Sequence, residues 1–199
     1  MKNVIALFFV MIVAGSAVAM NEIVVSELMY NSIDTDVEWI EMINHSEAAV
    51  DLTGWFVTDD NDTHTPMFLS GIMAPGDVMV LVGDEELFTA QYPGVANVFP
   101  VFFQTNAEGT WALGNGGDGV RIFNAAGELA FSMDYDDGGD WPGECDGDGP
   151  SLLLIDSGVS DFADPAAWMA GPEWGTPGYI EGTVATEEAT MGQIKSLYR

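Results

Sequence analysis

The stretch Glu38-Trp39-Ile40-Glu41-Met42-Ile43-Asn44, followed closely by Asp51-Leu52-Thr53-Gly54-Trp55, decides the fold class of this chain. Its side chains alternate as in a β-strand, and we expect the face that carries Ile40 and Met42 to point into the core. A polar turn, a short strand and a glycine corner come next. Short strands separated by turns are typical of a β-sandwich, and neither stretch contains a catalytic motif.

Further strand signals recur at short spacing, each bounded by turn residues. The expected strands are Ile23–Tyr30, Val50–Leu52, Trp55–Thr58, Val78–Val82, Trp111–Leu113, Val120–Phe123, Leu129–Asp134 and Ser151–Ile155. The continuous apolar run Val78–Val82 indicates a strand buried on both faces. Val98–Phe103 is also strand-like, but Pro100 makes it an edge strand or an irregular segment. Asp84 is suited to cap a short helix that runs to about Tyr92.

Two glycine-rich loops separate the strands of an expected meander. Gly114–Gly119 and Asn124–Gly127 contain residues that tolerate positive φ, as hairpin turns require. The first loop also matches the G-x-G-x-x-G pattern of dinucleotide-binding proteins, but that motif must open a helix. Here the expected strand Val120–Phe123 follows, so we expect a hairpin loop without a nucleotide.

Residues 1–19 have the pattern of an export signal. Lys2 is positive, Val4–Val13 is apolar, and Ala17-Val18-Ala19 is a cleavage site of small residues. We expect cleavage there, so that the mature chain begins at Met20 and the protein is secreted or held at the cell surface. No later run is long and apolar enough to span a bilayer, so we expect no membrane span after cleavage.

The rest of the chain has the length of one domain. We expect a β-sandwich domain over residues 20–182, followed by a linker and a short C-terminal helix or tail over residues 183–199. In the tail, Ile194, Leu197 and Tyr198 fall at helical spacing, with two basic residues beside them. This pattern fits a separate interaction or sorting segment as well as a frayed terminus.

The charge of the chain is strongly one-sided. It has 32 acidic and 4 basic residues, a formal net charge of −28. Such a surface repels nucleic-acid phosphates and anionic membranes, so we expect no nucleic-acid partner. A solvated acidic surface, a bound cation or a basic partner protein all fit it, and we expect a protein or cell-surface partner. Cys145 is the one cysteine, either buried and inert or paired with another chain; the oligomeric state is left open.

An acidic loop after the meander is the best candidate for a metal site. Loops rich in carboxylates and glycines hold calcium. The candidate ligands are Asp134, Asp136, Asp137, Asp140, Asp146 and Asp148. Their spacing differs from the helix–loop–helix calcium motif because Gly138 and Cys145 stand at ligand positions. Solvated turns rich in Asp and Gly are the alternative.

Catalytic groups are scarce. His45 and His64 are the only histidines, and neither lies beside a recognisable nucleophile motif. Glu27, Glu38 and Glu41 lie on or beside expected strands and could form the carboxylate pair of a glycoside hydrolase, but nothing fixes their separation. Structural polar contacts at strand ends are the simpler interpretation of Glu27 and Glu38. The six tryptophans fit core positions or, alternatively, platforms for glycans.

An ordered set of short motifs resembles the lamin tail domain, in the form carried by exported bacterial proteins. The similarity covers about Asn21 to Gly182. The motifs are Glu27-Leu28-Met29-Tyr30-Asn31, Glu38–Asn44, Asp51–Trp55, Pro75-Gly76-Asp77, Trp141-Pro142, Gly147–Leu152 and Gly175-Thr176-Pro177-Gly178. The resemblance implies an immunoglobulin-like β-sandwich without an active site of its own.

The resemblance and the residues together lead to an exported, non-enzymatic binding or structural module. It would mediate attachment or recognition, because exported bacterial members of the family often accompany hydrolases, nucleases or adhesion modules. Two alternatives stay open: a calcium-binding accessory domain of an extracellular hydrolase or nuclease system, and a glycan-binding module.

Overall fold

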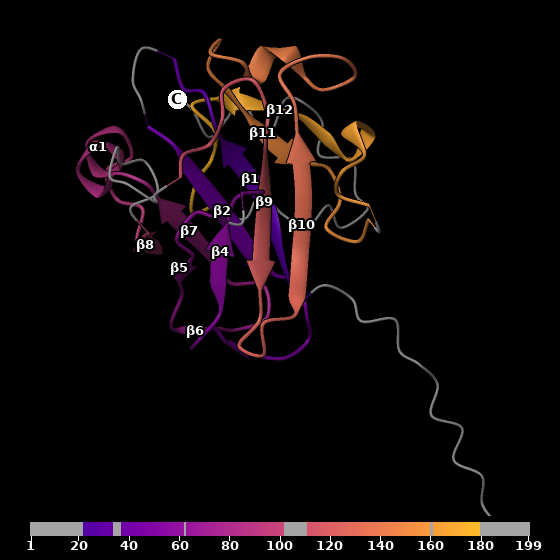
Figure 1. Cartoon of the computed structure of the whole chain (residues 1–199). Coiled ribbons are helices and arrows are strands. Elements are labelled where there is room, and N and C mark those ends of the chain that lie inside the picture. The colour runs from indigo at the N-terminus through magenta and orange to yellow at the C-terminus, as the bar shows by residue number, and fades with distance from the viewer. Residues whose placement is uncertain (1–21, 34–36, 62, 102–110, 160, 180–199) are drawn as a thin grey trace, which may run out of the picture.

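Two β-sheets pack face to face and enclose one main core (Figure 1). The computed structural model describes residues 22–33, 37–61, 63–101, 111–159 and 161–179. The expected signal peptide and C-terminal tail lie outside these residues. Because the described elements are strands with one short α-helix and two 3₁₀ turns, the expectation of an all-β sandwich is confirmed.

The larger sheet has six strands, in the spatial order β12 (Trp168–Glu173), β11 (Pro150–Leu154), β1 (Ile23–Met29), β2 (Trp39–Asn44), β7 (Val78–Val82) and β8 (Val98–Pro100). The smaller sheet has four strands, in the order β10 (Leu129–Tyr135), β9 (Asp118–Phe123), β4 (Phe56–Thr58) and β5 (Met67–Phe68). A short ribbon pairs β3 (Val50–Asp51) with β6 (Ile72–Met73). Two 3₁₀ turns, η1 (Gly143–Cys145) and η2 (Pro165–Ala167), precede β11 and β12.

The central strand β2 is buried along its whole length. Ile40 and Met42 join the main core between the sheets, as expected. Trp39 lies in a second apolar cluster, together with Val80 of β7 and Phe88. Both faces of the larger sheet are therefore covered near its centre, and the prediction that β7 is buried on both faces is confirmed.

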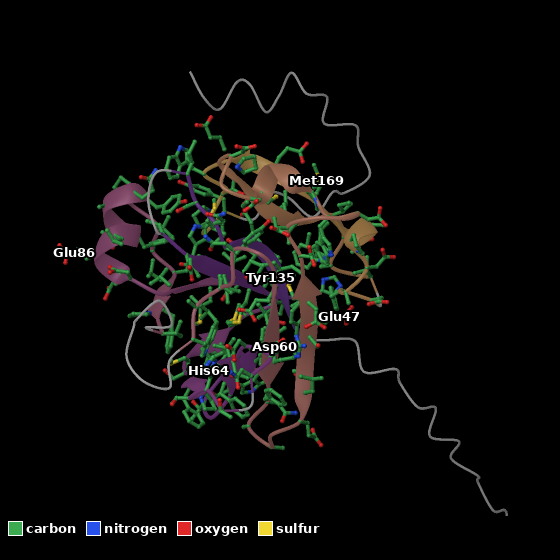
Figure 2. All side chains as sticks on the ribbon, turned by 45° about the horizontal axis from the view of Figure 1, so that its top comes forward. Glu47, Asp60, His64, Glu86, Tyr135 and Met169 are labelled. Atoms are coloured by element: carbon green, nitrogen blue, oxygen red, sulfur yellow. The ribbon has the colours of Figure 1, made fainter. Side chains whose placement is uncertain are left out.

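The helix α1 (Glu85–Gln91) supplies the cover for the second cluster. It begins where expected, because an Asp84 carboxylate oxygen accepts a hydrogen bond from Leu87 N at 2.9 Å. Phe88 is the buried residue of the helix, whereas Glu86 projects away from the body of the protein (Figure 2). The apolar face of the helix therefore packs on the outer side of the larger sheet.

The hairpin between β9 and β10 is confirmed. Gly127 has φ +77°, and its N–H donates to Asn124 O at 2.9 Å. The turn needs this conformation, which glycine adopts without steric cost. Ala130 is a bulge residue, because Leu129 lies opposite Phe123 while Phe131 lies opposite the residue just before Phe123 in β9.

Some expected elements differ from the structure. Trp111–Leu113 is not a strand, because Leu113 N donates to a carboxylate oxygen of Glu38 at 2.9 Å instead of to a neighbouring strand. The loop Gly114–Gly119 is accordingly a turn that leads into β9 and not a hairpin between two strands. In contrast, the expectation that Val98–Phe103 is an edge strand or an irregular segment is confirmed over the described part, because β8 is an edge strand that runs parallel to β7.

Candidate functional site

Two glutamates lie side by side within the larger sheet. Glu27 on β1 and Glu41 on β2 are directly opposite each other in the antiparallel ladder. Their side chains are buried, with exposed fractions of 1% and 3%. Buried carboxylates require hydrogen-bond donors, so the neighbours of this pair determine what it can do.

Glu27 is held by two segments that lie far away in the sequence. One of its oxygens accepts from Ser151 Oγ on β11 and from Thr176 N, the latter at 2.9 Å. The other accepts from Thr176 Oγ1 at 2.8 Å. Glu27 therefore fixes the segment that follows β12 onto the sheet.

Glu41 accepts a hydrogen bond from the same segment, two residues further along the chain. Its Oε2 accepts from Gly178 N at 2.7 Å, and its Oε1 accepts from Ser26 Oγ at 2.7 Å. Burial raises the pKa of Glu41 to about 7; the Ser26 hydrogen bond opposes this rise, and the nearby charge of Glu27 adds to it. Glu41 can therefore hold a proton near neutral pH.

Residues Trp174–Tyr179 form what we call the strap, which covers the carboxylate pair. Trp174 N donates to Gly149 O at 2.8 Å, and Trp174 O accepts from Tyr92 Oη, also at 2.8 Å. Gly175 has φ +66°, and a Cβ there would lie only 2.7 Å from both a Glu27 oxygen and the Trp39 ring. Thr176 is buried, so the strap seals the pair from solvent.

A covered pair of this kind is suited to hold a proton and a chain segment. It offers no room for a sugar next to the carboxylates, because Thr176 and Gly178 already occupy their oxygens. The third candidate, Glu38, is separate: one of its oxygens accepts from Leu113 N. The arrangement does not support the glycoside-hydrolase interpretation of these three glutamates.

The six expected calcium ligands are exposed and do not converge. Asp134 pairs with Arg121, and one oxygen of Asp136 accepts from Gly138 N at 2.9 Å within its own turn. Asp146 accepts from Asn31 Nδ2 at 2.7 Å. Among the residues that the structure describes, no three His, Cys, Asp or Glu side chains are placed to hold a metal ion. Calcium binding by Asp134, Asp136, Asp137, Asp140, Asp146 and Asp148 stays a prediction from the sequence.

The histidines and the cysteine are in structural contacts. His45 Nδ1 lies 2.8 Å from Ser157 Oγ, and His64 Nδ1 contacts a carboxylate oxygen of Asp59. The thiol of Cys145 is 1% exposed and donates to Ser151 O at 3.1 Å. Burial raises the pKa of this thiol to about 12, so Cys145 is the inert, buried cysteine of the two alternatives.

The tryptophans are mostly core residues. Trp39, Trp55, Trp111 and Trp168 are buried, and only Trp141 and Trp174 are partly exposed. Four of the six are therefore closed to a glycan. In the described part of the chain, no helix is both apolar enough and long enough to cross a bilayer.

An exposed apolar row crosses the outer face of the smaller sheet, and the sequence did not predict it. Leu129 on β10 lies opposite Phe123 on β9, which lies opposite Phe56 on β4, which lies opposite Phe68 on β5. The Phe56 and Phe123 rings stack at 4.8 Å, and the Phe56 and Phe68 centroids are 5.7 Å apart. Phe68 and Leu129 are 67% and 55% exposed. From the sequence, the alternation within each strand indicates that these side chains point outward. That they form one row follows only from the pairing of the strands.

Comparison with known proteins adds one match. The family profile described as Lamin Tail Domain matches residues 16–137, more than half of the chain. No curated protein matches the chain. The matched region ends just after β10, whereas β11 and β12, which complete the larger sheet, and the strap follow it in sequence. The family has an immunoglobulin-like β-sandwich fold, with which the two-sheet architecture agrees.

Proposed function

Since the chain belongs to the lamin tail domain family, we propose that it is an exported, non-enzymatic binding module that acts in attachment or recognition at the cell surface or beyond it. The observation that carries this proposal is the apolar row Leu129–Phe123–Phe56–Phe68. Apolar side chains that are exposed or partly exposed and lie opposite one another across four strands are typical of a surface that another molecule covers. The buried carboxylates, in contrast, are engaged by the protein itself.

The chemistry of the partner follows from charge. The chain has a net charge of −28, and Arg121, the one Lys or Arg among the described residues, is paired with Asp134. We propose that the partner is a protein surface with an apolar centre and flanking Lys and Arg side chains. Such a surface complements both the row and the negative charge of the chain, and its association would be accelerated by electrostatic attraction.

Matched single substitutions test this surface. Phe68→Ser and Leu129→Ser should each abolish binding of the labelled mature chain to intact cells of the producing organism, and 0.5 M salt should weaken binding by the unmodified chain. Tyr179→Ser and Ile155→Ser are the controls, because these residues are 68% and 52% exposed but lie away from the row. Equal losses in all four variants, or unchanged binding by Phe68→Ser and Leu129→Ser, would refute the proposed site.

Export is tested separately. Protein recovered from the producing organism should lack residues 1–19 and begin at Met20, and it should be found in the cell-surface or medium fraction. Full-length protein confined to the cytosol would contradict this part of the proposal.

Calcium binding is a second candidate function, favoured by one observation at the acidic loop. The hydroxyl of Tyr30 is buried without a hydrogen-bond partner among the described atoms. Burial and the charges of Cys145, Asp146, Asp137 and Asp136, in this order, raise the pKa of Tyr30. A cation held by these three aspartates would offset their charges at Tyr30, and their side chains would have to draw together to bind it.

A melting experiment tests the calcium candidate. Millimolar calcium should raise the melting temperature of the unmodified chain and leave Asp136→Ala/Asp140→Ala unchanged. The double variant Asp156→Ala/Asp161→Ala removes two aspartates outside the loop and should behave like the unmodified chain. No rise, or equal rises in all three proteins, would end the calcium proposal.

A further inference from the structure

The strap and the carboxylate pair beneath it have properties that a purely structural contact does not require. Each strap amide bonded to the pair, Thr176 N and Gly178 N, donates to a different glutamate. The two glutamates lie opposite each other on adjacent strands.

We propose that the strap Trp174–Tyr179 is a proton-linked clasp. It stays closed while Glu41 carries a proton, and it opens more readily when Glu41 is ionised. Opening admits water to the Glu41 carboxylate, whose negative charge is stabilised far better by hydration than by a dry interior. The strap is also the segment through which the domain continues into residues 180–199, so its opening would lengthen that connection.

The contacts of Glu41 provide a place for the proton. Ser26 Oγ lies 2.7 Å from Glu41 Oε1 and 3.3 Å from the backbone oxygen of the same residue. When Oε1 is protonated, it donates to Ser26 Oγ, and the serine hydroxyl donates to the backbone oxygen instead. Gly178 N continues to donate to Oε2. The closed clasp therefore retains every hydrogen bond in the protonated state.

The other titratable groups around the pair do not titrate in the same range. Tyr92, which follows α1, donates from its hydroxyl to Trp174 O and accepts from Trp39 Nε1. Burial raises its pKa to about 12, and burial raises that of Cys145 on η1 to about 12. β7 contains no titratable residue. Within the strap, the one titratable residue is Tyr179, which is exposed. Tyr92 and Cys145 therefore keep their protons between pH 5.5 and pH 8.5, the range in which Glu41 loses its own.

Hydrogen exchange of individual strap amides tests the clasp in the mature chain. Protection factors compare each amide with the unfolded chain at the same pH and so report the opening equilibrium. From pH 5.5 to pH 8.5, protection of Thr176 N and Gly178 N should fall about 30-fold more than that of core amides such as Leu81 N, given a Glu41 pKa near 7.

The variant Glu41→Gln tests the role of the proton while it retains the hydrogen bonds of the closed strap. The glutamine amide can donate to Ser26 Oγ and accept from Gly178 N, so it copies the protonated carboxyl group. The variant should keep the strap protected at both pH values. Glu173→Gln is the matched control, because it removes a charge at the end of β12, next to the strap, without touching the pair. It should retain the pH dependence of the unmodified chain.

Three results would overturn the clasp: equal strap protection at both pH values in the unmodified chain, unchanged pH dependence in Glu41→Gln, or loss of that dependence in Glu173→Gln. If Glu41→Gln does not fold, the amide shift of Gly178 in the unmodified chain decides. It should titrate with a midpoint within about one unit of pH 7, and a flat response from pH 5 to pH 9 would reject the proposal.

Discussion

At the scale of single residues, one missing methyl group allows the strap to lie over the carboxylates. Gly175 combines φ +66° with a site where a Cβ would come within 2.7 Å of Glu27 and Trp39. Neither neighbour can withdraw, because Glu27 is held by Ser151 and Trp39 is fully buried. The backbone conformation and the lack of space therefore act together.

Gly175→Ala should destabilise the protein by about 3 kcal/mol, the sum of left-handed strain and overpacking. Gly139→Ala is the control, because Gly139 has φ +68° but nothing within 4 Å of its Cβ position. It should cost only about 1 kcal/mol. Urea unfolding of both variants measures the difference, and equal losses would show that the close approach over Glu27 does not matter.

Glu41 makes global stability depend on pH. Its pKa is raised from 4.5 to about 7 in the folded protein, so the folded state binds more protons than the unfolded state between these values. Stability is therefore greatest below pH 4.5 as far as this group is concerned, falls as the pH rises toward 7, and is level above it. The loss is on the order of 3 kcal/mol.

Glu41→Gln should be more stable than the unmodified chain at pH 8 and should lose most of the slope between pH 5 and pH 7. Urea unfolding at a series of pH values measures both effects. Asp51→Asn is a useful contrast, because the hydrogen bonds of Thr53 lower the pKa of the exposed Asp51 and its neutralisation should act in the opposite direction. A parallel slope in Glu41→Gln would contradict the assignment.

At the scale of elements, α1 shows how a local signal controls the packing of a sheet face. Asp84 supplies the one side-chain hydrogen bond to the first turn, and α1 then carries Phe88 onto Trp39 and Val80. A helix of seven residues is too short to be stable alone. Its cap and its buried phenylalanine must therefore cooperate.

Asp84→Ala should cost about 1 kcal/mol and should increase hydrogen exchange within α1 more than in β9. Glu85→Ala changes a neighbouring exposed carboxylate without removing the cap and should cost much less. Thermal unfolding and amide exchange provide the two measurements. Equal effects of the two substitutions would show that charge at the helix start, and not the cap, stabilises the helix.

Elements with strong local signals could be predicted, and elements defined by their neighbours could not. Consecutive residues carry the signals for β2, which alternates, for β7, which is a continuous apolar run, and for the start of α1, which has a capping residue. β5 and β6 contain two residues each, and no periodicity is visible at that length. β12 contains Gly171 and Pro172, which argue against a strand, yet it is an edge strand where a missing N–H is tolerated.

The site was predictable only in part, for the same reason. The sequence identified Glu27 and Glu41 as strand carboxylates and Gly175–Gly178 as a motif, but the hydrogen bonds between them span more than 130 residues. Trp111–Leu113 illustrates the converse error. Its apolar residues resemble a strand, whereas the backbone bond of Leu113 goes to the Glu38 side chain.

At the scale of the whole molecule, charge is the dominant feature. The full chain has a net charge of −28, and its described residues contain one Lys or Arg, Arg121. Like charges on a compact surface repel one another, and unfolding relieves that repulsion by separating them. The fold is therefore stabilised by its apolar core against an electrostatic term that added ions can screen.

Raising the salt concentration from 10 mM to 500 mM should stabilise the mature chain by about 1 kcal/mol, or roughly 3 °C in melting temperature. Because screening depends on ionic strength and not on the identity of the ion, sodium chloride and choline chloride should act equally. Sucrose at matched osmolality, which screens nothing, should shift the melting temperature less and without the steep rise below 200 mM. A chain that melts at the same temperature across this salt range would show that its acidic groups are too well solvated for their repulsion to influence the fold.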